Sequence, residues 1–281
     1  MPSFAAMDGT QLAYRIVGEG EPLICIPGGP MRASSYLGDL GGLLETRRLV
    51  LPDLRGTGRS AVPDDPATYR CDRQVADIEA LREHLGAERV DVLAHSAGGD
   101  LALLYAARFP QRVRSLVLIT ARARALGIDF TGEQRLEAAL LRQGEPWFRA
   151  GLDAFEALLA GTASDADWEA AAPFFYGRWD DAARKHAASE VEQTNEEAAE
   201  LYTSSGAFAE PAAVRAAVAD TPVLILAGEL DGGPLPRVAA DIAGLFAKAE
   251  LVVQPRAGHY PWLDGPGRFA GTVTGFLRNR A

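Results

Sequence analysis

The chain has 281 residues, of which 48% are hydrophobic, with a formal net charge of −10 and a mean hydropathy of −0.04. No apolar run approaches the ~18 residues that cross a bilayer, so we expect neither a transmembrane segment nor a membrane partner. Nucleic acid is not an expected partner either, because phosphate binding needs clustered Lys and Arg. The length fits two domains or one large α/β domain with an insertion.

The first nine residues lack the basic start and apolar core of a signal peptide, which predicts a cytoplasmic protein. Cys25 and Cys71 have neither the Cys-x-x-Cys spacing nor the density of a disulfide framework, and we expect both to be reduced. No metal site and no cofactor are predicted.

Along the chain, short apolar runs alternate with segments of helical periodicity. A hairpin is expected at 10–17, entered through Asp8 and Gly9, and expected strands cover 22–26, 48–51, 90–93, 113–119, 223–227 and 250–253. Expected helices cover 34–44, 72–85, 96–109, 236–246 and 266–277. Strands that are apolar on both faces and separated by helices predict an α/β fold with a mostly parallel sheet covered on both sides.

This alternation breaks once, over residues 122–215, where the sequence is rich in Ala and Glu and has no convincing strand. The segment holds 17 acidic against 9 basic side chains, a charge of −8 out of the total −10. We predict a helical cap at 122–215, including a helix over 184–202, inserted into a core formed by 1–121 and 216–281. Such a cap would roof the site, because ligands of open α/β sheets bind beyond the carboxyl ends of the strands.

Residues 94–98 read Ala-His-Ser-Ala-Gly, directly after an apolar run and before a helical pattern. This is typical of a nucleophile elbow, a sharp strand-to-helix turn that needs small residues two positions either side of the nucleophile. The usual form is G-x-S-x-G, and Ala94 departs from it by one methyl group. Taken alone, the pattern predicts catalysis by Ser96 no more strongly than a simple turn.

A serine hydroxyl needs a base, and the chain has four histidines to supply one. His84 falls in an amphipathic helix and His186 in the cap. His95 precedes the serine, and its side chain should point away from that of the serine. His259 follows the last expected strand in a Gly-His loop, so we predict that His259 is the base.

The carboxylate that orients the base is expected at the end of another strand. Asp231 follows the strand at 223–227 and is preferred over Glu229, which comes too soon after the strand, and over Asp264, which could begin an ordinary helix. The resulting chain order of serine, aspartate and histidine is one that the strand-turn-helix arrangement of a nucleophile elbow uses.

Two backbone N–H groups should bind the oxyanion. Ala97, directly after the nucleophile, supplies one. The other should come from the Pro-Gly-Gly-Pro loop at 27–30, where both prolines lack an N–H and Gly29 allows close approach to a substrate. Gly29 is therefore the predicted second donor, although the loop could also be a simple turn.

Several motifs in one order resemble the α/β-hydrolase superfamily, and within it most closely the proline iminopeptidase (prolyl aminopeptidase) branch. They are Pro-Gly-Gly-Pro at 27–30, Asp-Leu-Arg-Gly-Thr-Gly-Arg-Ser at 53–60, the elbow at Ser96, Gly-Glu-Leu-Asp at 228–231 and Gly-His at 258–259. The branch has H-G-G-P-G in the first loop, where this chain has Pro27 and Met31. The resemblance implies an α/β-hydrolase fold with an eight-stranded sheet and a cap after the sixth strand, with Asp53 and Arg55 bracing loops.

In the iminopeptidase branch, acidic cap residues hold the free amine of the substrate, one of them in a Trp-x-x-Trp-Glu segment. The segment at 176–180 is similar, so the resemblance implies that Asp180, Trp179 and Tyr176 bind substrate. The alternative is that the cap acids form a solvated helix face.

Together, these residues predict a serine hydrolase that acts on a small molecule or short peptide through an acyl-enzyme. Two substrate classes stay open: amides cleaved by a proline iminopeptidase-like aminopeptidase, and esters or lactones. A third possibility is a non-catalytic ligand-binding homologue. The oligomeric state is not predicted.

Overall fold

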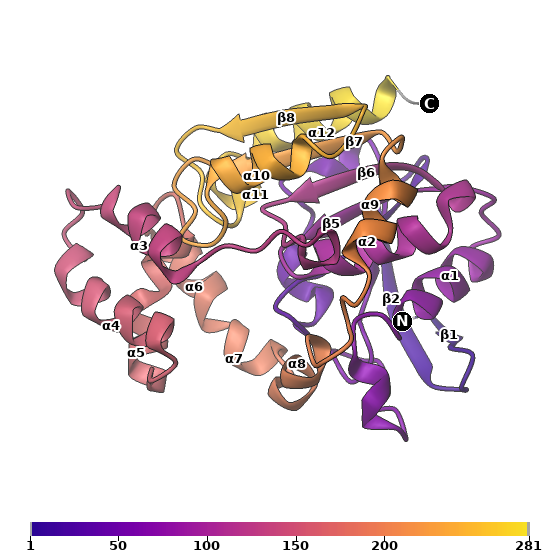
Figure 1. Cartoon of the computed structure of the whole chain (residues 1–281), viewed down its shortest axis with the longest axis horizontal. Coiled ribbons are helices and arrows are strands. Elements are labelled where there is room, and N and C mark those ends of the chain that lie inside the picture. Colours follow the sequence, from indigo (N-terminus) through magenta and orange to yellow (C-terminus); the bar gives the residue numbers. More distant parts are fainter. Residues whose placement is uncertain (1, 280–281) are drawn as a thin grey trace.

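The computed structural model describes residues 2–279 and contains one eight-stranded sheet in the order β1-β2-β4-β3-β5-β6-β7-β8 (Figure 1). The first two strands pair antiparallel, and β3 to β8 run parallel. This confirms the predicted sheet and adds β1, which the sequence pattern did not indicate. The strands are β1 Ser3–Ala5, β2 Gln11–Val17, β3 Pro22–Ile26, β4 Arg48–Pro52, β5 Val90–His95, β6 Val113–Ile119, β7 Val223–Gly228 and β8 Ala249–Gln254.

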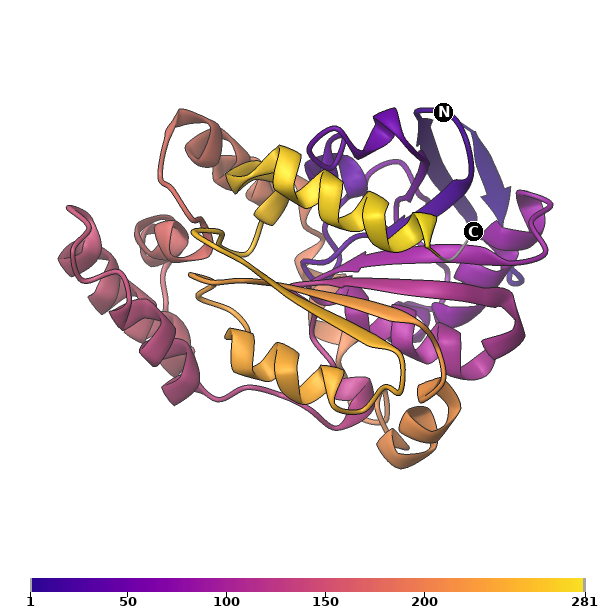
Figure 2. The same ribbon diagram turned by 90° about the horizontal axis from the view of Figure 1, so that it is seen from above.

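Helices cover both faces of the sheet, with α12 on one side of the strands and α10 on the other (Figure 2). Successive strand residues point to opposite faces: Ile24 joins the apolar cluster under one layer of helices, and Leu23 and Cys25 join the other. One layer contains α1 Val75–His84, α2 Gly98–Arg108, α9 Pro211–Val218 and α10 Pro236–Ala243; the other contains α12 Pro266–Arg278.

The predicted helix over 34–44 is wrong. Two short 3-10 turns stand there, η1 Ser34–Leu37 and η2 Leu43–Glu45. Gly38, Gly41 and Gly42, which lie between them, all have positive φ. These left-handed conformations interrupt a right-handed helix, and glycine adopts them without the steric cost of a side chain. The other short helices of the core are η3 Pro66–Tyr69, η4 Pro110–Arg112 and α11 Pro261–Asp264.

The segment between β6 and β7 is helical and contains no strand in the described structure. It comprises η5 Arg124–Leu126, α3 Gly132–Leu140, α4 Phe148–Ala160, α5 Asp165–Ala171, η6 Ala172–Phe175, α6 Asp181–Ala188, α7 Glu190–Gln193 and α8 Glu196–Tyr202, followed by α9. Helices α4 and α5 pack around Phe155 and Phe174 in a small apolar cluster of their own. Helix α9 instead packs against α2 of the core.

The predicted continuous helix over 184–202 is also wrong, because it divides into α6, α7 and α8. Thr194 is extended and forms a bridge with Arg32, and the Asn195 side chain caps α8 by accepting the Ala198 N–H. Val191, in α7, is 83% exposed. Across residues 2–279, no helix is both long and apolar enough to span a membrane.

Candidate active site

Ser96 stands at the sharp turn between β5 and α2, with φ of 51°. A left-handed serine is strained, and such strain persists where surrounding contacts fix it. Here the Ser96 N–H donates to Ile119 O at 3.0 Å, and its carbonyl accepts the Arg122 N–H at 2.9 Å. A Cβ on Gly98 would lie 2.5 Å from Pro27 O, which explains why this end of the elbow needs glycine. The structure thus has the backbone of a nucleophile elbow.

His259 and Asp231 come together from the loops after β8 and β7. His259 Nδ1 lies 2.9 Å from Asp231 Oδ2 and 3.1 Å from Oδ1. Asp231 is fully buried, and its Oδ1 also accepts the Gly233 N–H at 2.7 Å. A carboxylate only accepts, so His259 donates through Nδ1 and keeps Nε2 as an acceptor. This tautomer is the one that a general base for a serine requires.

Within residues 2–279, no hydrogen bond joins Ser96 Oγ to the His259 ring, as is common in enzymes without substrate. Ser96 and His259 are 7% and 8% exposed. The other two acids considered from the sequence bind backbone instead. Glu229 accepts the Arg256 N–H at 2.7 Å, and Asp264 accepts those of Gly177 and Gly258 at 3.0 and 2.8 Å.

The loop that holds Gly29 packs against the elbow, since a Cβ on Gly28 would lie 2.8 Å from Ser96 Cβ. The Gly28 carbonyl accepts the Arg32 N–H at 3.1 Å. Because the N–H of a trans peptide points opposite to its carbonyl, the Gly29 N–H is directed away from Arg32. The Ala97 N–H lies at the start of α2, where helix N–H groups have no intrahelical partner. Both predicted oxyanion donors therefore remain predictions compatible with this backbone.

A cap segment that sequence reasoning missed contacts both acid and base loops. Residues 174–177, which we call the cap strap, accept two main-chain hydrogen bonds: Phe174 O from Gly232 N at 3.0 Å, and Phe175 O from His259 N at 2.7 Å. A Cβ on Gly258 would lie 2.6 Å from Phe175 O. The bonds use backbone atoms, which side-chain identity does not encode; the adjacent glycines at 232 and 258 are the only sequence signal.

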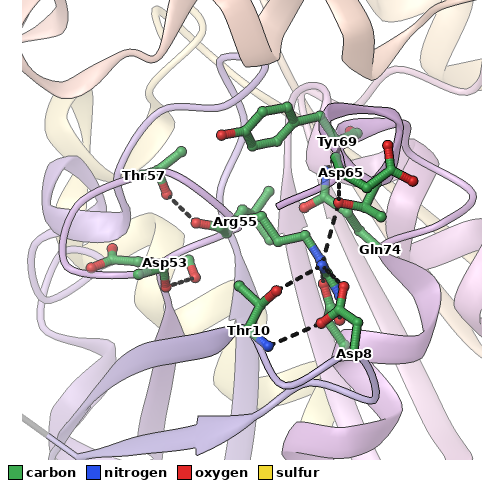
Figure 3. A network of polar contacts seen from close by, with 12 residues as sticks. Asp8, Thr10, Asp53, Arg55, Thr57, Asp65, Tyr69 and Gln74 are labelled. Carbon is green, nitrogen blue, oxygen red and sulfur yellow. Dashed lines mark hydrogen bonds and ion pairs between the residues drawn. The ribbon is translucent and has the colours of Figure 1, made fainter. Parts of the chain in front are cut away.

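Asp53 and Arg55 hold loops together, as interpreted from the sequence. Asp53 Oδ1 accepts the Ser34 N–H and hydroxyl at 2.9 and 2.8 Å. Arg55, buried in the protein, donates twice to Asp77 at 2.6 and 2.7 Å and also contacts Asp8 (Figure 3). The hydrogen bond from Arg55 lowers the pKa of Asp8 to about 2. This ion-pair network ties the N-terminal hairpin to α1.

The three cap residues predicted to bind substrate make other contacts. Tyr176 is 2% exposed, and its hydroxyl lies 2.8 Å from His186 Nδ1. Trp179 packs on Tyr176 and under Arg184. Asp180 caps α6 by accepting the Ala183 N–H and pairs with Arg178 at 2.8 Å. Substrate binding by these residues stays a prediction.

Asp100 is a buried acid near the elbow that sequence reasoning also missed. It lies in the first turn of α2, and its Oδ1 accepts the Ala125 N–H at 2.9 Å, whereas the buried Oδ2 has no hydrogen-bond partner in the described part of the chain. Burial raises the pKa of Asp100 to about 6, partly offset by the Ala125 hydrogen bond and by Arg122 and Arg124.

The family model described as "alpha/beta hydrolase fold" matches residues 21–266. A curated proline iminopeptidase of Lactobacillus helveticus is 38% identical over 117 residues, covering 39% of this chain and 40% of the relative. A cis-3-alkyl-4-alkyloxetan-2-one decarboxylase of Shewanella oneidensis is 33% identical over 122 residues, covering 43% of this chain and 38% of the relative. The aligned stretches thus span only about two fifths of these relatives.

Among solved structures, the proline iminopeptidase of Mycobacterium smegmatis has a TM-score of 0.75 at 23% identity, covering 99% of this chain and 98% of that chain. The esterase RhEst1 from Rhodococcus sp. ECU1013 also has a TM-score of 0.75, at 20% identity, covering 100% of this chain and 99% of that chain. At such identities, these matches establish the fold. Sheet order, elbow and family match agree: the chain belongs to the α/β hydrolase fold family.

Proposed function

We propose that the protein is a serine hydrolase that cleaves an ester or amide bond through an acyl-enzyme intermediate. The observation that carries this proposal is the buried pair between His259 Nδ1 and Asp231, which leaves Nε2 as the basic atom of a ring that packs against His95, the residue before Ser96 in the elbow. The family match and the hydrolases among the relatives support the same chemistry.

In the proposed reaction, Ser96 Oγ attacks the substrate carbonyl carbon and passes its proton to His259 Nε2. Asp231 stabilises the imidazolium, and the Gly29 and Ala97 N–H groups bind the oxyanion. Collapse of the tetrahedral intermediate breaks the bond to the leaving group, which takes the proton from His259. Water then gives a proton to His259 and attacks the acyl-enzyme, which releases the acid and restores Ser96.

The substrate class is the finer part of the proposal. The relatives include proline iminopeptidases, but the oxyanion loop departs from that branch at Pro27 and Met31, and both oxygens of Asp180 are engaged within the cap. We therefore expect short-chain aryl esters to be hydrolysed faster than a prolyl arylamide. Parallel assays of both substrates test this ranking, and faster arylamide turnover would favour the aminopeptidase instead.

The test of the chemistry is Ser96→Ala together with a fluorophosphonate probe. We expect the probe to label the native protein at Ser96 and to leave the variant unlabelled. On a confirmed substrate, kcat should fall on the order of 10⁶-fold, as in other triads. Turnover by the variant at the native rate would disprove the assignment. A native protein that does not react with the probe would point to a non-catalytic ligand-binding homologue.

A further inference from the structure

Behind the proposed site, two buried side chains connect the oxyanion loop to the backbone of His259. Tyr36 lies in η1 and His95 ends β5, and they are 5% and 2% exposed. The Gly28 N–H donates to Tyr36 Oη at 2.6 Å, and Tyr36 Oη lies 2.7 Å from His95 Nδ1. On the far side of the ring, His95 Nε2 lies 2.9 Å from the His259 carbonyl oxygen. The four residues form one unbroken chain of hydrogen bonds.

With a neutral His95, the chemistry of the two ends allows only one arrangement of protons along this hydrogen-bond chain. The Gly28 N–H can only donate, so Tyr36 accepts from it, and the His259 carbonyl can only accept, so His95 Nε2 carries a proton. Neutral histidine has one ring proton, which leaves Nδ1 as an acceptor for the Tyr36 hydroxyl. Every donor then meets an acceptor, and the tautomer of His95 is fixed.

The surroundings of His95 keep its ring neutral. Burial lowers the pKa of His95 well below its usual range, and the neighbouring His259, Arg32 and His186 lower it further, while the hydrogen bond to the His259 carbonyl opposes them. The His95 and His259 ring centroids are 4.8 Å apart. A neutral ring at this distance leaves His259 free to become the only cation of the pair during catalysis.

The hydrogen-bond chain from Gly28 to His259 holds both loops that the proposed reaction uses. The His259 carbonyl accepts a second hydrogen bond, from Thr120 Oγ1 at 2.9 Å, while the His259 N–H donates to the cap strap. Thr120 makes this contact from a backbone with a φ of 43°, a rare conformation for a β-branched residue. At the other end, Tyr36 holds the Gly28 N–H, which belongs to the peptide directly before the one that presents the Gly29 N–H.

We infer that Tyr36 and His95 are positioning residues, which set the Gly29 donor and the His259 base relative to each other through the one-directional chain Gly28–Tyr36–His95–His259. This inference rests on the proposed function. Neither side chain takes part in bond making, and both act through the groups they hold.

The first experiment measures the rate of fluorophosphonate labelling at Ser96, which needs no known substrate. Tyr36→Phe removes one hydroxyl, and we expect it to slow labelling on the order of tenfold, since small misplacements of reacting groups are costly. The matched control is Tyr14→Phe, because Tyr14 is also buried and its hydroxyl lies 3.0 Å from His84 Nε2, outside the proposed site. We expect this control to label at the native rate.

A second pair of variants, at His95, tests the hydrogen-bond chain if Tyr36→Phe does not fold. His95→Gln keeps an acceptor and a donor in one side chain, whereas His95→Leu removes both. A positioning role predicts that His95→Gln labels at least about tenfold faster than His95→Leu. On a confirmed ester, the loss should fall on kcat, with KM unchanged. ¹⁵N NMR should show His95 of the native protein protonated at Nε2 and not at Nδ1.

The outcomes separate the two proposals. A native protein that is not labelled at Ser96 overturns the proposed function. If the native protein is labelled, equal rates for Tyr36→Phe and Tyr14→Phe, equal rates for the two His95 variants, or a proton on His95 Nδ1 overturn the positioning role alone.

Discussion

The core and the cap contribute to the proposed site in different ways. The core places Ser96, Asp231 and His259 at the carboxyl ends of β5, β7 and β8, where buried parallel strands fix the start of each loop. The cap packs α4 and α5 around its own apolar cluster and contacts the catalytic loops through the main chain of the cap strap. The core therefore supplies the reacting groups, and the cap holds two of their loops in place.

A second cap attachment depends on one buried cation. Arg32, 1% exposed, donates to the His186 carbonyl, the Ser189 hydroxyl and the Gln193 side chain, and it also pairs with Glu190. The same guanidinium lies over the Tyr36 ring, 4.5 Å from its centroid. The oxyanion loop and the base loop are thus each joined to the cap by main-chain hydrogen bonds, to which the oxyanion loop adds the side-chain bonds of Arg32.

Disrupting the contacts between the cap strap and the His259 loop should cause the largest loss of reactivity at Ser96. In Gly258→Ala, the new Cβ would meet Phe175 O at 2.6 Å and Tyr176 C at 2.7 Å, so the strap or the His259 loop must move. We expect the fluorophosphonate labelling rate at Ser96 to fall on the order of a hundredfold, because His259 shifts relative to the serine.

The matched control is Gly271→Ala on α12, where no atom of the described residues 2–279 lies within 4 Å of the added Cβ. Labelling of this control should match that of the native protein. If Gly258→Ala unfolds at the native temperature and is labelled at Ser96 at the native rate, the cap strap covers the site without positioning His259.

The difference between the core and the cap also explains which elements could be predicted from the sequence. Strands β3 and β6 match the predicted ranges 22–26 and 113–119, because buried parallel strands are uninterrupted apolar runs. The helix over 184–202 had the right periodicity but broke at Thr194 and Asn195, which dock on the oxyanion loop: Asn195 N donates to Met31 O. Such a break is set by a tertiary contact, which periodicity does not report.

Within the site, the elbow, the acid loop and the base loop each carry a local residue pattern, and the structure brings Asp231 and His259 into contact. The cap strap carries no such pattern, since it acts through carbonyl oxygens. The place of His95 directly before the serine predicts only that its side chain points away from that of Ser96. Its contact with the His259 carbonyl joins positions 164 residues apart, which only the fold reveals.

A smaller effect, on the pH dependence of the free energy of unfolding, should come from the buried charge of Asp100 in the core. Its pKa in the folded protein, about 6, lies above the unfolded value, so between about pH 4 and pH 6 the native state binds more protons than the unfolded chain. The native protein therefore loses stability as pH rises through this window. Asp100→Asn keeps an acceptor for the Ala125 N–H without the charge.

We expect Asp100→Asn to raise the free energy of unfolding at pH 8 by roughly 2 kcal/mol, with the gain disappearing near pH 4. Urea unfolding across this pH range measures it. Asp153→Asn, at an exposed acid of α4, serves as the control and should follow the native pH profile. A gain that is the same at pH 4 and pH 8 would exclude the buried charge as its cause.

The smallest effect, on KM, is expected from a substitution of Asp180 on the cap surface. Asparagine is as good a helix cap as aspartate, so Asp180→Asn keeps the bond to the Ala183 N–H and removes only the charge. Its exposed ion pair with Arg178 is worth at most about 1 kcal/mol. We expect KM for aryl esters and for a prolyl arylamide to stay within about twofold of the native values. A rise in KM confined to the arylamide, with ester kinetics as the internal control, would instead identify Asp180 as the amine anchor and give the cap a direct part in substrate choice.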